Sequence, residues 1–129
     1  MSVTYNMTNQ LLKKVWQRGA VVEGCDPNLI RKDCCGALLL YHSYNDHNSN
    51  FGWGVDHILP VSAGGDDNPI NLRPMHWKNL QYKGDSYPDY EFAVTAEGNE
   101  NVERAGVRTV NVSIQEDLKK TLRHRHIEL

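Results

Sequence analysis

The first clear hydrophobic pattern along the chain has the spacing of a helix. A stripe of apolar side chains begins shortly after Thr8 and consists of Leu11, Leu12, Val15 and Trp16. A threonine at this place accepts a hydrogen bond from the first N–H groups of a helix, and glycine readily follows a helix end. The pattern therefore predicts a helix that Thr8 caps and that ends near Gly19.

Short apolar runs in the middle of the chain predict strands. Residues 37–41 are apolar and follow a glycine, which is typical of a strand or a buried turn. Residues 52–62 predict a strand that Pro60 closes, and residues 70–72 predict a brief second strand after a glycine-rich loop. Pro74 can occupy the first turn of a helix, so that we expect a helix over about 75–84.

The last third of the chain predicts one strand and one helix. Alternating apolar side chains between residues 93 and 112 indicate a late strand. Ser113 and Glu116 have the spacing of a capping box, and Ile114, Leu118 and Leu122 then recur every fourth residue. The whole pattern indicates an α+β fold with helices before and after a central pair of strands.

The composition limits the classes of protein to consider. The chain has 129 residues, of which 40% are apolar, and this suits a single domain over residues 1–129. No apolar run approaches the ~20 residues that cross a bilayer, and the first residues do not have the pattern of a secretory signal. A net charge of −2 argues against a cationic nucleic-acid coat protein.

The cysteines favour free thiols over a disulfide framework. Cys25, Cys34 and Cys35 are an odd number and contain no pair separated by two residues. We therefore expect buried thiols in a reducing, cytoplasmic compartment and no structural zinc site.

The residues that can carry chemistry are concentrated between positions 52 and 85. Asp56 offers a hard oxygen ligand for a divalent metal, and His57 offers an imidazole that can deprotonate water. Asn71 follows, and His76 and Asn79 then lie three residues apart on one face of the expected helix. Brought together, these residues suit metal-assisted hydrolysis of a phosphodiester bond.

The same stretch resembles the HNH endonucleases, the ββα-metal nucleases. The pieces that carry the resemblance are Asp56-His57-Ile58-Leu59-Pro60, Gly64-Gly65, Asn71-Leu72 and Lys83-Gly84. A bacterial and phage subgroup also has motifs similar to Cys35-Gly36-Ala37, Gly52-Trp53 and His76-Trp77. The resemblance implies a ββα-metal motif with its core at about 52–85 and an enzyme that cuts DNA.

The resemblance also implies a role for each site residue. His57 would be the general base, Asp56 a metal ligand, and Asn71 the residue that holds the loop between the strands and so orients His57. The family places its helical ligand nine residues after the central Asn, where this chain has Leu80. Asn79 is the favoured replacement, with His76 in reserve, and loss of the second ligand is the other outcome.

The expected cofactor is a divalent metal, with Mg²⁺ first and Mn²⁺, Zn²⁺ or Ni²⁺ as alternatives. The expected partner is DNA in a bacterial or phage-infected cell, with no membrane; a homodimer would account for cutting both strands. Two alternatives stay open. One is a non-catalytic module that binds nucleic acid or protein, and the other is a nuclease toxin domain with an immunity protein.

Overall fold

The computed structural model describes residues 7–126, with side chains up to Leu122, and its fold is α+β. The described helices are α1 (Asn9–Trp16), α2 (Trp77–Lys83) and α3 (Val112–His126). The strands are β1 (Ala20–Val21), β2 (Ile30–Lys32), β3 (Leu38–Leu40), β4 (Trp53–His57), β5 (Leu72–His76), β6 (Asp89–Glu97) and β7 (Glu100–Thr109).

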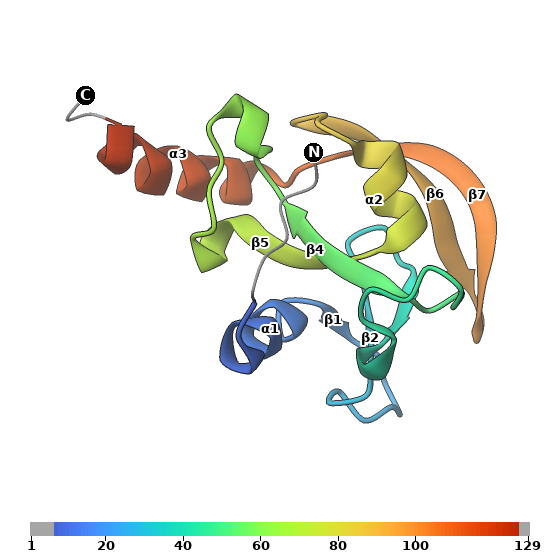
Figure 1. Cartoon of the computed structure of the whole chain (residues 1–129). Coiled ribbons are helices and arrows are strands. Elements are labelled where there is room, and N and C mark those ends of the chain that lie inside the picture. Colours follow the sequence, from blue (N-terminus) through green and yellow to red (C-terminus); the bar gives the residue numbers. More distant parts are fainter. Residues whose placement is uncertain (1–6, 127–129) are drawn as a thin grey trace.

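The N-terminal helix follows the pattern that predicts it. The Thr8 hydroxyl accepts a hydrogen bond from the N–H of Leu11 at 3.1 Å. Val15 and Trp16 are buried, and the Trp16 ring packs against the buried ring of Trp53 at the start of β4. The apolar stripe of α1 therefore fixes this helix against the central hairpin (Figure 1).

The centre of the fold is an antiparallel hairpin followed directly by a helix. Strands β4 and β5 pair in a register that sets Asp56 opposite Arg73 and His57 opposite Leu72, and α2 begins at the next residue after β5 (Figure 1). The predicted helix start is wrong. Pro74 lies within β5, opposite Val55, and His76 caps α2 by accepting a hydrogen bond from the N–H of Lys78.

In the last third of the chain the observed elements differ from the predicted strand and helix cap. The one late strand becomes a long curved hairpin, in which β6 pairs antiparallel with β7 over most of its length (Figure 1). The cap of α3 is also different, because the Asn111 side chain accepts hydrogen bonds from the N–H and the hydroxyl of Ser113. Ser113 therefore lies inside the first turn instead of capping it.

One cluster of buried side chains joins the hairpin, β6 and α3. It contains Cys35, Ile58, Met75, Tyr90, Val110, Leu118 and Leu122. The prediction of buried thiols is correct for Cys35 and wrong for Cys34, which is exposed. None of the helices in the described part of the chain is long and apolar enough to cross a membrane.

Asn79 ties α2 to the long hairpin. Its side-chain oxygen accepts hydrogen bonds from the N–H groups of Ala93 and Val94, both at 2.8 Å. Its amide nitrogen donates to the Val94 carbonyl at 2.9 Å and to the Asp33 carboxylate at 3.1 Å. The side chain is fully buried, so no water can replace it as the partner of these backbone groups of β6.

We predict that Asn79→Ala lowers the free energy of unfolding by about 2–4 kcal/mol, because buried N–H and C=O groups of β6 lose their partners. Urea unfolding measures the change. Gln81→Ala, on the exposed side of the same helix, is the matched control and should change stability by less than ~0.5 kcal/mol. Equal effects of the two substitutions would contradict this role.

Candidate active site at the central hairpin

The loop between β4 and β5 is held closed by Asn71. Its side-chain oxygen accepts the N–H of Leu59 at 2.8 Å, and its amide nitrogen donates to the carbonyls of Leu59 and Asp66, both at 3.0 Å. Asn71 is fully buried, and it therefore joins the two ends of the loop that follows His57. The resemblance assigns Asn71 this contact; its importance for activity stays a prediction.

Gly64 and Gly65 allow the loop to close on Asn71, each for a different reason. Gly64 has φ +102°, a backbone conformation that glycine adopts at little cost. A Cβ on Gly65 would lie 1.8 Å from the carbonyl oxygen of Leu59 and 2.9 Å from Nδ2 of Asn71. The glycine pair is therefore required by backbone geometry and by the close approach of Asn71.

His57 lies at the end of β4 beside an open pocket. The pocket has a volume of about 220 Å³, and Asp56, His57, Ser62, Leu80 and Asp85 are among the residues that line it. The His57 side chain is 16% exposed, and its Nε2 lies 2.8 Å from the carboxylate of Asp67. Asp67 lies in the loop and gives no signal in the sequence that would pair it with His57.

Asp56 is held by two cations of the protein. Its carboxylate accepts a hydrogen bond from Nε of Arg73 at 2.8 Å and lies 3.2 Å from Nζ of Lys83. Lys83 is only 1% exposed, and it also donates to the carbonyls of His57 and Ile58. Burial opposes the charge on Arg73, but Asp56 together with Cys34 and Tyr90 outweighs this effect, so that the pKa of Arg73 is raised.

The helix does not turn Asn79 or His76 towards Asp56. Asn79 uses its whole amide group on Asp33 and β6. His76 is fully buried, its Nδ1 accepts from the N–H of Lys78 at 3.1 Å, and its Nε2 lies 2.8 Å from the carbonyl of Asn50. The expectation that either side chain reaches the metal is therefore not met by this geometry.

Leu80 takes the position that faces the hairpin. A Cβ on Gly54 would lie 3.0 Å from Cδ1 of Leu80, and Leu80 lines the same pocket as Asp56 and His57. The helix therefore keeps the phase that the family resemblance implies, with an apolar side chain where an amide or imidazole ligand is expected. Asn79, the expected replacement ligand, therefore does not face the hairpin.

A resident divalent metal does not fit the described residues at this site. Both oxygens of Asp56 already contact a cation, and a metal beside Arg73 and Lys83 would be repelled by their charges. Leu80 offers no ligand atom, and no group of three or more His, Cys, Asp or Glu residues suited to a metal occurs among the residues that the structure describes.

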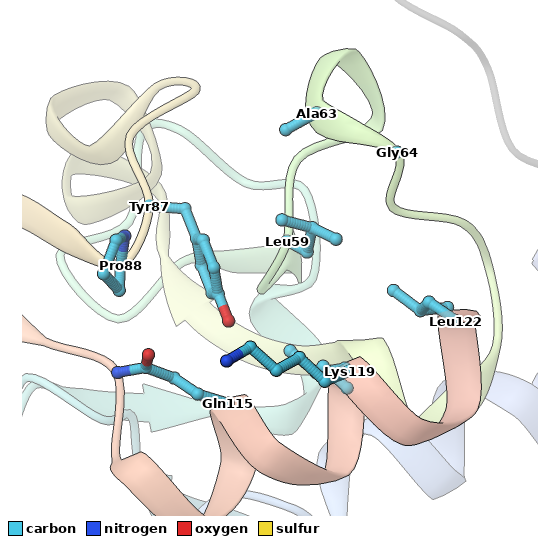
Figure 2. A pocket seen from close by; sticks show the side chains of 9 residues that line it. Leu59, Ala63, Gly64, Tyr87, Pro88, Gln115, Lys119 and Leu122 are labelled. Carbon is cyan, nitrogen blue, oxygen red and sulfur yellow. The ribbon is translucent and has the colours of Figure 1, made fainter.

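A second pocket, of about 310 Å³, lies between α3 and the loop after β4. Figure 2 shows Tyr87 and Lys119 on its walls, together with the apolar side chains of Leu59 and Leu122. Burial raises the pKa of Tyr87. The walls are mostly apolar and contain no histidine or carboxylate, so we place the candidate chemistry at His57.

Comparison with known proteins does not extend this assignment. No family model matches the chain, and neither a curated protein nor a solved structure does. The site therefore rests on the residues and contacts described above.

We predict that acid destabilises the fold through His76. Burial lowers the pKa of its imidazole, so the unfolded chain takes up the proton first as the pH falls below about 6.5. The free energy of unfolding then falls with pH, by at most about 1.4 kcal/mol per pH unit, until the folded histidine is protonated as well.

Thermal unfolding between about pH 7.5 and 5.5 measures this loss. His76→Asn is the matched variant, since asparagine also caps a helix and does not titrate. The wild-type midpoint should fall more steeply than that of the variant. Parallel curves for the two proteins would show that His76 does not carry the effect.

Proposed function

We propose that the chain is an endonuclease of the HNH type that hydrolyses phosphodiester bonds in DNA, with His57 as its general base. The observation that carries the proposal is the position of His57: at the end of a hairpin strand, beside a pocket, next to Asp67 and followed by a loop that Asn71 closes. The order of two antiparallel strands and a helix supports it.

The contact with Asp67 suits a base. The carboxylate of Asp67 lies within hydrogen-bond distance of Nε2 and orients the ring, and an imidazole held in this way can take a proton from an attacking water. In nucleases of this type a divalent metal stabilises charge on the phosphate and the leaving oxygen. Because such a metal does not fit at Asp56 as the site stands, the proposal assigns the base and no metal ligand.

The second candidate is a non-catalytic module that binds nucleic acid on the same scaffold. The ion pairs of Asp56 with Arg73 and Lys83 favour it, together with Leu80 at the position where a ligand is expected. Such a module would bind DNA without cutting it and without any need for a divalent metal.

We predict that the protein nicks supercoiled plasmid and that His57→Ala slows nicking at least ~100-fold, because loss of a general base costs this much or more. Conversion to open circles on a gel measures the rate. His42→Ala removes an exposed histidine and is the control. Parallel reactions with Mg²⁺, Mn²⁺ or EDTA test the metal dependence that the resemblance implies. Binding without nicking in every reaction would favour the second candidate.

We predict that Leu80→Asn does not raise nicking in Mg²⁺, because both oxygens of Asp56 stay paired with Arg73 and Lys83 even when α2 supplies an amide oxygen. Leu80→Ala removes the same apolar bulk without adding an oxygen, and it is the matched control. A clear gain for Leu80→Asn alone would mean that a metal binds beside Asp56 despite the two cations.

A further inference from the structure

Three cationic side chains from separate parts of the chain line a small pocket beside β5. Its volume is about 150 Å³, and Arg18, Lys32 and Arg73 line it. Arg18 follows α1, Lys32 ends β2 and Arg73 lies on β5. The volume holds several water-sized groups, so it has room for one phosphate group.

Arg73 is paired with Asp56, but the charges of Arg18 and Lys32 have no carboxylate partner among the described side chains. Burial lowers the pKa of Arg18, and the nearby charge of Arg73 lowers it further. Arg18 donates one hydrogen bond to the carbonyl of Pro69, which carries no charge to balance the guanidinium group. Two guanidinium groups that repel one another, with an ammonium group beside them, favour an anion between them.

Arg73 adds a second, independent observation. Its Nε donates to Asp56, while its Nη2 is buried and has no hydrogen-bond partner among the described residues. A buried N–H group without a partner costs free energy that a ligand can recover. Guanidinium groups also bind phosphate oxygens in a fixed geometry with more than one hydrogen bond.

The carboxylate of Asp33 also lines the pocket, but other groups satisfy it. Its oxygens accept hydrogen bonds from the N–H groups of Cys35, Ala37 and His76 and from the amide of Asn79. Burial raises its pKa, although these hydrogen bonds oppose the shift. Asp33 is therefore a poor counter-ion for the three cations.

We propose that the pocket between Arg18, Lys32 and Arg73 binds a phosphate group, and that the sugar-phosphate backbone of DNA supplies it. The choice of DNA as the source rests on the proposed function. Arg73 joins this pocket to Asp56, so that one guanidinium group connects the bound phosphate to the hairpin that carries His57.

Cys34 provides a direct readout because it is exposed and lines the same pocket. Its contact with Cys35, followed by the charge of Arg73, lowers the pKa of its thiol and so favours alkylation. The experiment measures the rate of alkylation by iodoacetamide at each cysteine by mass spectrometry. Cys25 is half-buried, is not among the residues that line the pocket, and is the internal control.

We expect inorganic phosphate and a short DNA duplex each to slow the alkylation of Cys34, about tenfold when the ligand is present at ten times its Kd. Cys25 should react at an unchanged rate. Arg18→Gln keeps a hydrogen-bond donor at this position and removes the charge, and it should abolish protection. Lys14→Ala, an equal loss of charge on the exposed side of α1, should keep it.

The outcomes separate the parts of the proposal. Protection by both ligands supports it, and protection by phosphate alone overturns DNA as the source. Protection by DNA that Arg18→Gln leaves intact, or protection by neither ligand, overturns the pocket. Because alkylation needs no cleavage, a chain that fails to nick plasmid but shows protection loses only the proposed endonuclease activity.

Discussion

The carboxylate of Asp56 is the charge on which the arrangement of the site depends. It is 3% exposed and lies between Arg73 of β5 and Lys83 of α2, so that a single side chain joins both strands of the hairpin to the helix. Removing one partner of a buried ion pair typically costs about 3–5 kcal/mol, because the other charge stays buried without compensation. Lys83 extends the connection by donating to the carbonyls of His57 and Ile58. The end of β4 is therefore positioned by the same charges that neutralise Asp56.

The sequence suggests that Asp56 and His57 serve one site, as metal ligand and as general base. The contacts of Asp56 with Arg73 and Lys83 separate these two side chains. Neighbouring side chains on a strand point to opposite faces, and here Asp56 is buried beneath α2 while His57 is partly exposed near Asp67. The proposed base lies beside its pocket, while the carboxylate next to it in sequence is taken up by Arg73 and Lys83. Arg73 also has a second role, since it lines the pocket that we assign to phosphate. Arg73 therefore contacts the hairpin residue next to His57 and also lines the proposed phosphate pocket.

Local signals in the sequence predict the parts of the fold that depend on neighbouring residues. The cap of α1 by Thr8 and the strand that carries Asp56 and His57 are of this kind. Proline suits a first helical turn, so the local pattern predicts that Pro74 begins a helix, but pairing with Val55 keeps it in a strand. Asn79 has the right chemistry for a metal ligand, and only the distant backbone of β6 explains why it lies elsewhere. Contacts such as His57 with Asp67 depend on the path of a loop, which no periodic pattern encodes.

Arg73 and Lys83 hold the Asp56 carboxylate in the folded chain, and we expect no divalent metal to displace them. Thermal unfolding of the DNA-free protein in EDTA and in millimolar Mg²⁺ tests this expectation, because a ligand that binds the folded state raises the midpoint. We expect the same midpoint in both solutions. A rise of several degrees in Mg²⁺ that Asp56→Asn abolishes would contradict it, since Asp56 would then bind the metal despite Arg73 and Lys83.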